Sequence, residues 1–510
     1  MKILLILAGI VLLLILWDLF QKKHAILRNF PVIGHFRYLL ESVGPELRQY
    51  IVTDNDEERP FTRDQRTWVY TSAKKLNNYF GFGTDNALDL ANNYTLIKQV
   101  TFPYPEPHPG DEAFDPSYTL PAAKVLGGPR GRRRAFRPRS LVNTSAMSFG
   151  SLSAPAVEAI NRGAALCGCM QNTGEGGVSR HHDHGGELIW QLGTGYFGAR
   201  DEAGNFDLQR LVEVVERYPV RVLEIKLSQG AKPGHGGILP GAKVTAEIAA
   251  IRGVAQGKDC LSPSGHTAFR DADSLLDFVE TLADATGLPV GIKSAVGELE
   301  FWQQLADLME DGGRGVDYIA IDGGEGGTGA APLAFADHVA LPFRLGMSRV
   351  YPIFAERSLT DRIVFVGSGK LGFPESALVA FGLGCDMIAV AREAMLAVGC
   401  IQAQRCHTGH CPTGVATQNR WLMRGLDPTS KAARFANYIV TLRRELLELS
   451  RAVGHPHPAF ITPNEIEILD GGHHSRELAE VFGYRSGWGL PSAGDLAELR
   501  KIMEAGPQRV

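Results

Sequence analysis

Eight short apolar segments alternate with longer helical patterns between about residue 141 and residue 392. Each segment ends in Gly, Ser or a polar loop, as buried parallel strands do where they reach the edge of a sheet. The segments are LVNTSAMS, ALCGCMQN, LIWQLGTG, VLEIKLSQG, PVGIKSAV, DYIAIDGG, IVFVGSG and MIAVAR. Eight strands that alternate with helices over about 250 residues predict an α/β chain folded as a (β/α)8 TIM barrel.

An open doubly wound sheet is the alternative architecture for such an alternation. It is disfavoured because no GxGxxG motif follows the first predicted strand and opens a helix, as a dinucleotide-binding fold requires. The remaining suggestive glycines, Gly382 and Gly384, lack a third partner and follow a helical pattern. No site for a pyridine nucleotide is therefore expected.

The N-terminus carries an uncharged apolar run, ILLILAGIVLLLILW, which extends to Phe20 if Asp18 is tolerated at a membrane interface. A bilayer span needs about 20 apolar residues, with a lower limit near 17. A cleaved signal peptide is the alternative, but no small-x-small cleavage site follows the run. Three basic residues follow it by position 28 and only Lys2 precedes it. We therefore expect a single-pass membrane anchor over residues 1–21, with the catalytic domain in the cytoplasm.

Composition divides the rest of the chain into three parts. Residues 22–140 are polar, Pro-rich and irregular, and they predict an N-terminal extension that packs on the barrel. The barrel is expected over residues 141–430 and a C-terminal helical segment over residues 431–510. The basic run GPRGRRRAFRPR in the extension is interpreted as a solvated connector. The net charge of −4 gives no case for a nucleic-acid partner.

Polar, Gly-rich sequence follows several predicted strands, at the end of a barrel where active sites form. Gly367, Ser368 and Gly369 follow the seventh strand and Arg392 follows the eighth. Glycine N–H groups and a guanidinium suit a phosphate group there. Lys293 ends the fifth strand. It either reaches solvent or faces the N1–C2=O edge of a reduced flavin, which carries negative charge.

The loop SQGAKPGHGGILPGAK, residues 228–243, holds five glycines, two prolines and two lysines. Such a loop cannot be a regular helix or strand. Its N–H groups and Lys232 suit an anionic substrate that bears carboxylates. Glu175 and Glu325 are the acidic groups of two further Gly-rich loops, NTGEGG and DGGEGGTGAAP, which are expected to face a ligand.

Three thiols lie within twelve residues, at Cys400, Cys406 and Cys411. With His407 or His410 as a fourth ligand they could bind zinc, although zinc sites usually use CxxC pairs. Three cysteines without a fourth nearby also suit a [3Fe–4S] cluster, which has three irons to ligate. The other four cysteines have irregular spacing and apolar contexts, which indicate core positions rather than a disulfide framework.

These motifs closely resemble the FMN-binding synthase domain of glutamate synthase. The similarity extends in order from about residue 141 to residue 420, in the motifs SAMSFGSLS, NTGEGG, QLGTGYFG, EIKLSQGAKPG, GGTGAAP and GCIQAQRCHTGHCPTGVATQ. The earlier segment NFPVIGHFRYLLESVGPELRQY resembles the start of stand-alone glutamate synthase large-subunit-like proteins with an N-terminal membrane segment. The resemblance implies a TIM barrel that holds FMN and a [3Fe–4S] cluster.

The resemblance also implies an FMN-dependent oxidoreductase acting on CH–NH2 groups, which converts 2-oxoglutarate and ammonia, through 2-iminoglutarate, to L-glutamate. Electrons would pass through the iron–sulfur cluster to FMN from a separate donor, a ferredoxin or a flavoprotein reductase. The cluster ligands implied by motif are Cys400, Cys406 and Cys411. The implied FMN contacts are Ser145, Met147, Ser148, Gln191, Lys293, Gly327, Gly367, Ser368, Gly369 and Arg392. The implied catalytic and 2-oxoglutarate-binding residues are Glu175, Gln229, Lys232 and Arg252.

Two departures from the family pattern leave the substrate open. The GAKPG loop usually continues with Glu and Gln, where this chain has His235 and Ile238. Full-length glutamate synthases also begin with a glutaminase domain and end with a β-helix, for which this chain is expected to have no room. The second hypothesis is therefore a membrane-tethered FMN and iron–sulfur module. It would serve electron transfer or redox sensing, or act on a different 2-oxo acid or amine.

Overall fold

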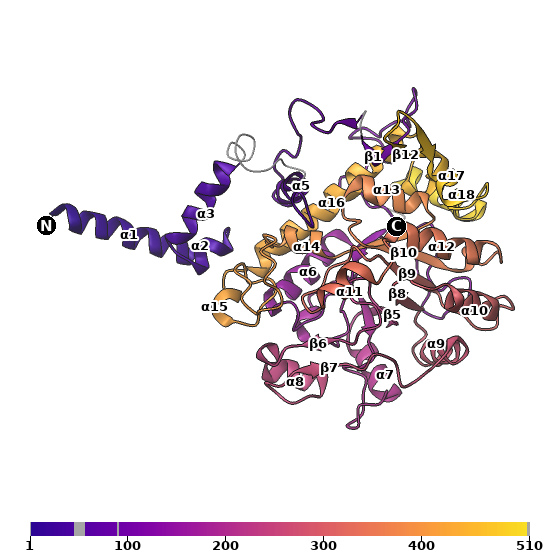
Figure 1. Ribbon diagram of the computed structural model, residues 1–510, viewed down its shortest axis with the longest axis horizontal. Coiled ribbons are helices and arrows are strands. Elements are labelled where there is room, and N and C mark those ends of the chain that lie inside the picture. The colour runs from indigo at the N-terminus through magenta and orange to yellow at the C-terminus, as the bar shows by residue number, and fades with distance from the viewer. Residues whose placement is uncertain (1, 45–56, 89–90, 507–510) are drawn as a thin grey trace.

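Eight parallel strands form a barrel at the centre of the computed structural model, which describes residues 2–44, 57–88 and 91–506 (Figure 1). They are β2 (Val142–Thr144), β3 (Gln171–Asn172), β4 (Leu188–Leu192), β5 (Val220–Lys226), β8 (Val290–Ser294), β9 (Tyr318–Asp322), β10 (Val364–Ser368) and β11 (Met387–Val390). Their order in the sheet is β2-β11-β10-β9-β8-β5-β4-β3. The N–H of Thr144 donates to the carbonyl of Met170 at 3.1 Å, which joins β2 to the start of β3. The predicted TIM barrel is confirmed.

All eight predicted strands are present, but the second is shorter than expected. The first three residues of ALCGCMQN end α6 (Ala154–Cys167), the next three connect the helix to the sheet, and only the last two pair as β3. The side chain of Ser153 caps the first turn of α6, and Gly168, at φ +71°, ends the helix. The start of this apolar run is therefore the last turn of a capped helix, which a short run does not distinguish from a strand by periodicity.

Helices surround the barrel and supply the apolar side chains of the core (Figure 1). The amphipathic segments predicted near residues 271–287, 373–384 and 433–454 are helical as expected. A short hairpin of β6 (Ile238–Leu239) and β7 (Cys260–Leu261) interrupts the alternation between β5 and β8. The helices after α6 are α7 (Leu208–Arg217), α8 (Ala246–Arg252), α9 (Ala272–Thr286), α10 (Glu300–Met309), α11 (Leu333–His338), α12 (Phe343–Ala355), α13 (Pro374–Gly382), α14 (Arg392–Ala397), α15 (Arg420–Met423), α16 (Pro428–Ala452), α17 (Leu478–Phe482) and α18 (Ala493–Ala505).

A small antiparallel sheet joins the two ends of the chain. It pairs β1 (Asn92–Ile97) of the N-terminal extension with β12 (Ile466–Asp470), and β12 with β13 (Ser475–Glu477). The expectation of a purely helical segment after residue 430 is therefore wrong for β12 and β13. The main partner of β12 is more than 360 positions away in the sequence, so no local hairpin signal precedes it.

The extension also contacts the barrel at the end opposite to the strand-end loops. The Nζ of Lys124 donates to the carbonyls of Thr360 and Ile363, at 2.8 and 3.0 Å, and pairs with Asp386 at 2.9 Å. Ile363 and Asp386 directly precede β10 and β11. These contacts tie the extension to the amino-terminal end of the barrel, where residues serve stability rather than chemistry.

The N-terminal helix α1 (Lys2–Phe20) projects away from the rest of the molecule (Figure 1). Within the described ranges it is the helix that is long and apolar enough to cross a membrane, and a signal sequence passes the same test. Two short helices follow at its base, α2 (Ala25–Asn29) and α3 (Ile33–Ser42). The carboxylate of Asp18 is buried and accepts hydrogen bonds from the N–H of Val32, at 2.9 Å, and from His35, at 2.8 Å.

Close packing of α6 on α16 depends on Gly163. A Cβ at this position would lie 2.6 Å from the Phe435 ring and 2.7 Å from the carbonyl of Ala432. We expect Gly163→Val to lower the free energy of unfolding by about 1–3 kcal/mol, because neither the ring nor the backbone can yield without strain. Denaturant titration followed by fluorescence measures the loss. Ala165→Val, on the exposed side of α6, is the control and should cost less than about 1 kcal/mol. Equal losses in the two variants would contradict the packing argument.

Candidate functional site

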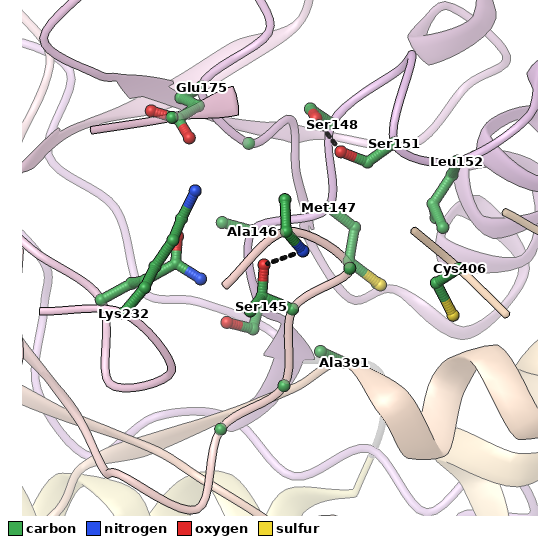
Figure 2. Close-up of a pocket in the computed structure, with 18 of the residues that line it drawn as sticks. Ser145, Ala146, Met147, Ser148, Ser151, Leu152, Glu175, Lys232, Ala391 and Cys406 are labelled. Atoms are coloured by element: carbon green, nitrogen blue, oxygen red, sulfur yellow. Dashed lines mark hydrogen bonds between the residues drawn. The ribbon is translucent and has the colours of Figure 1, made fainter. Parts of the chain in front are cut away.

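A pocket opens at the carboxyl ends of the barrel strands and gathers most of the predicted site residues (Figure 2). In this view Glu175 and Lys232 lie on one side and Cys406 on the other, with Ser145 and Met147 between them. The predicted residues that line the pocket are Ser145, Met147, Ser148, Glu175, Gln191, Gln229, Lys232, Arg252, Lys293, Gly327, Ser368, Gly369, Arg392 and Cys406. Residues from separate strands, loops and helices along the chain thus face one space.

Lys293 is a buried cation at the end of β8. Its Nζ donates to the hydroxyl of Ser145 at 2.9 Å and lies 3.4 Å from a carboxylate oxygen of Asp322. Burial alone would raise the pKa of Asp322, but the charge of Lys293 and the N–H of Gly230 hold that pKa below its ordinary value. These contacts hold Lys293 inside the pocket, where it is buried rather than reaching solvent.

A buried polar network around Glu224 orients the side chain of Gln191. Its side-chain amide donates to Glu224 at 2.6 Å. The same carboxylate accepts hydrogen bonds from Asn172 at 2.8 Å and from the Tyr318 hydroxyl at 3.0 Å. Sequence reasoning missed Glu224, although an acidic residue in the middle of the apolar strand VLEIKL was a usable signal, because a buried carboxylate requires partners.

Glu175 lies among cations on the side of the pocket away from Cys406 (Figure 2). Lys226 donates to its carboxylate at 2.9 Å and to the side chain of Gln229 at 2.8 Å. Burial would raise the pKa of Glu175, but Lys226, with Lys232 and Arg252 beyond it, holds that pKa below its usual value. Sequence reasoning also missed Lys226, which ends β5 six residues before Lys232 and was visible as a second cation at the same strand end.

Lys232 and Arg252 are cations whose hydrogen-bonding capacity is not fully used within the described residues. Lys232 is 4% exposed, and its Nζ has one acceptor within the described residues, the carbonyl of Gly236 at 3.3 Å. Burial, and then the charge of Lys226, lowers the pKa of Lys232. Arg252 donates to the carbonyl of Phe149 at 3.1 Å, and its buried Nε has no acceptor there. An anionic ligand in the pocket would supply the missing acceptors.

Backbone from three loops, at Gly327, Gly369 and Arg392, encloses another part of the pocket. Gly369 has a φ of +131°, a conformation that favours glycine. A Cβ at Gly327 would collide with the side chain of Arg392, so the loop approaches that guanidinium closely. Arg392 in turn donates to the carbonyl of Glu325. Close backbone, the hydroxyl of Ser368 and one arginine are the groups that bind a phosphate.

Two residues of the predicted ligand-facing loops do not line this pocket. Gly367 is not part of the pocket wall, because a Cβ there would lie 2.8 Å from both the Phe343 ring and Leu371. Its small size permits packing under the loop. Glu325 also does not line the pocket: its carboxylate accepts the N–H of Phe343 at 2.8 Å, and burial raises its pKa. Both residues support the loops that form the pocket.

The three predicted metal ligands stand on one loop after α14. Cys406 lines the pocket, Cys411 is buried, and the N–H of Gln402 points at the sulfur of Cys400 at 3.4 Å. Burial raises the pKa of Cys400 to about 12, and the charges of Cys411 and Cys406 add to this rise. All three are free thiols. Within residues 2–44, 57–88 and 91–506, however, no three His, Cys, Asp or Glu side chains form a ready-made metal site.

Comparison with known proteins shows that this chain is similar to glutamate synthases. The family model described as "Conserved region in glutamate synthase" matches residues 130–456. The glutamate synthase large subunit-like protein YerD of Bacillus subtilis is 37% identical over 475 residues, which cover 88% of this chain and 90% of that protein. An archaeal glutamate synthase (NADPH) of Methanocaldococcus jannaschii is 34% identical over 345 residues, which cover 67% of this chain and 64% of that protein. Among solved structures, a flavocytochrome b2 variant with sulfite bound matches 86% of each chain at 14% identity, with a TM-score of 0.44.

Proposed function

The chain belongs to the glutamate synthase family, and from that premise we propose that it is an FMN-dependent oxidoreductase that converts 2-oxoglutarate, through 2-iminoglutarate, to L-glutamate. The observation that carries this proposal is the division of one pocket into two sides. One side holds the buried Lys293 and the glycine loops, and the other holds Glu175 among three cations.

FMN fits the side of the pocket that Lys293 and the loops enclose. Ser368, Gly369 and Arg392 would bind the phosphate, because close backbone and one guanidinium suit three phosphate oxygens. Lys293 would face the N1–C2=O edge, where its charge stabilises the reduced ring, and Gln191 and Met147 would line the ring system. FMN, when bound, supplies the hydride for the substrate carbon.

The substrate fits the side of the pocket that Lys232 and Arg252 occupy. A dicarboxylate needs two groups of cations or donors, and these two residues have spare hydrogen-bonding capacity. Glu175 is charged and held by Lys226, so it can orient an iminium or an amine and exchange a proton with it. Gln229, bound to Lys226, fixes that lysine in place.

An iron–sulfur cluster of the [3Fe–4S] type is proposed at Cys400, Cys406 and Cys411. The set of donors suits it, since three neighbouring thiols and an N–H directed at one sulfur are typical of such clusters. When bound, the cluster carries single electrons. Its loop contacts the flavin side directly, because a Cβ at Gly329 would lie 3.1 Å from the Cβ of Cys406. We propose a separate ferredoxin or flavoprotein as the electron donor.

The N-terminal helix α1 is proposed to anchor the chain in a membrane as a single span, with the barrel on the cytoplasmic side. Its length, its composition and its exposed apolar surface support the anchor. The basic residues just after the span, Lys22, Lys23 and Arg28, favour this orientation.

Anaerobic mixing tests the enzyme function. The full chain, purified with its flavin and reduced by dithionite, is mixed with 2-oxoglutarate and ammonium while flavin absorbance and glutamate are followed. We expect flavin reoxidation in step with glutamate formation. A reduced flavin that stays reduced, with no glutamate, would exclude this activity and favour the second function, an electron-transfer or redox-sensing module. A colourless and iron-free protein would contradict both functions.

The side chain at position 238 is expected to affect the KM for 2-oxoglutarate. This residue lines the pocket beside Lys232 and offers no polar atom to a carboxylate. We expect Ile238→Gln to lower the KM for 2-oxoglutarate about 10-fold, since a hydrogen bond to a charged group contributes about 1.5–3 kcal/mol. Leu261→Gln is the matched control, because Leu261 pairs with Ile238 across the hairpin and is exposed. An unchanged or higher KM in Ile238→Gln would indicate a 2-oxo acid with an apolar end.

A further inference from the structure

A second pocket lies on the other side of the cysteine loop, between the base of the N-terminal helix and the barrel. Helices α2 and α3 form one wall, and α14, α16 and α5 (Arg63–Ala73) form the other. Cys400 and Thr413 contribute to the lining, so the pocket borders the proposed cluster loop from outside. The proposed function uses none of its charged residues.

The pocket is strongly cationic. Its lining includes Lys23, Arg37, Lys74, Lys431 and Arg434, against the single carboxylate of Glu41. Glu41 is already paired with Arg37 at 3.6 Å. The nearby carboxylate of Asp427 is paired with Lys22 at 3.3 Å. The positive charge of this pocket is therefore not neutralised by the described part of the chain.

Lys431 is the strongest indication of a ligand. Its side chain is 2% exposed, and within the described residues its Nζ makes no hydrogen bond and no ion pair. Burial, and then the charges of Arg434 and Lys74, lowers the pKa of Lys431 to about 7, and the opposing charge of Asp427 does not offset these effects. An unpaired buried cation is costly unless an anion completes the site. Arg434 adds a second positive charge to the pocket, and its guanidinium donates to the carbonyl of Lys23 at 3.0 Å.

The place of the pocket indicates where that anion comes from. Lys23 lines the pocket only three residues after α1 ends, within the depth of a headgroup layer if α1 crosses a bilayer. The buried Asp18 ties α1 to α3 through Val32 and His35. The side of α3 that faces away from the pocket is apolar and exposed, at Ile33, Phe36, Leu39 and Leu40. Such a helix lies flat in a membrane interface.

We propose that this pocket binds the phosphate group of an anionic membrane lipid. Lys431 and Lys74 would contact the phosphate oxygens, and the apolar wall of Ile26, Leu396 and Ile401 would receive the glycerol backbone. The uncompensated positive charge selects against a zwitterionic headgroup. The anion site stands on its own contacts, whereas its lipid source rests on the membrane anchor proposed above.

The full chain in a nonionic detergent tests the proposal, with short-chain lipids added below their critical micelle concentration. Dihexanoyl phosphatidylglycerol should raise the melting temperature by about 2–4 °C, and dihexanoyl phosphatidylcholine and inorganic phosphate should not. Lys431→Met should melt at a higher temperature than the wild type without lipid, because the unpaired charge is gone, and should lose the lipid shift. Lys74→Gln, at the rim, should weaken the shift. Lys501→Met, on the exposed surface of α18, is the charge-matched control and should keep it.

The outcomes separate this proposal from the proposed function. An equal shift with inorganic phosphate would overturn the lipid source. No lipid shift in the wild type, together with an unchanged melting temperature in Lys431→Met, would overturn the site itself. Flavin absorbance and the response to 2-oxoglutarate should be the same in Lys431→Met and wild type, because Lys431 is not in the flavin pocket. A protein that makes no glutamate but shows the lipid shift would contradict the proposed function alone.

Discussion

Replacing Lys293 by methionine is expected to lower the free energy of unfolding by about 3–5 kcal/mol and to abolish FMN retention. Lys293 and Asp322 are both nearly inaccessible to solvent, and the ammonium is the counter-charge that keeps the pKa of Asp322 low. Without it, the Asp322 carboxylate is left buried beside Gly230 and must either stay charged without a partner or take up a proton. The proposed flavin would also lose the cation at its N1–C2=O edge.

A double variant separates the two effects of this change. Lys293→Met with Asp322→Asn removes both charges and keeps an acceptor for the N–H of Gly230, so most of the lost stability should return. Flavin retention should not return, because the positive charge is still absent. Thermal melting gives the stability, and the ratio of flavin to protein absorbance gives the retention. Lys258→Met, on the surface, is the control. Flavin retained by the double variant would contradict the assigned contact.

Serine at any of the three clustered cysteines is expected to remove the iron and to lower glutamate formation from an external electron donor by at least about 100-fold. Each thiol would supply one of only three ligands, so losing one leaves an iron without its protein ligand. Cys406 is the most informative position, because it lines the flavin pocket as well. Iron content and EPR spectra of anaerobically purified Cys406→Ser measure the loss.

Direct chemical reduction provides the internal control for the cysteine variants. Dithionite reduces flavin without an intervening carrier, so Cys406→Ser with its FMN should still react with 2-oxoglutarate and ammonium once reduced. Cys385→Ala removes a buried thiol away from the loop and should keep both iron and activity. Stoichiometric zinc in the wild type, with no iron, would instead indicate a zinc site, although His407 and His410 are exposed.

Local sequence patterns are sufficient to predict a strand or helix where a single segment contains the whole signal for it. The strands β4 to β11 of the barrel are apolar runs that end in glycine or polar loops, and α9 has an N-cap at Asp271 and an αL glycine at Gly287. Lys293 and Arg392 are predicted because the strand ends of a barrel meet at one face, and Ser145 is predicted by the family resemblance alone. The clearest failure among the strands is ALCGCM: its first three residues end α6, which Ser153 and Gly168 cap, and the other three form a connection.

Contacts between residues far apart in the sequence could not be predicted from these local patterns. The pairing of β1 with β12 joins segments more than 360 residues apart. Gly367 looked like a phosphate contact, yet Phe343 and Leu371 pack against it. Glu224 and Lys226 lie two residues apart on the same face of β5, and only the neighbouring segments decide that Glu224 contacts Gln191 whereas Lys226, at the end of the strand, contacts Glu175.

The sequence by itself determined the barrel, the order of its loops and the family to which they belong, because periodicity and motif spacing act over a few residues. Tertiary structure alone decided which charges are paired. Lys293 has Asp322 and Lys226 has Glu175, whereas Lys431 forms no ion pair with a carboxylate of the described residues, and Asp427 acts on it only through its charge. The physical reason is that the free energy of a buried charge depends on what lies within a few ångströms of it, and those neighbours come from distant parts of the chain.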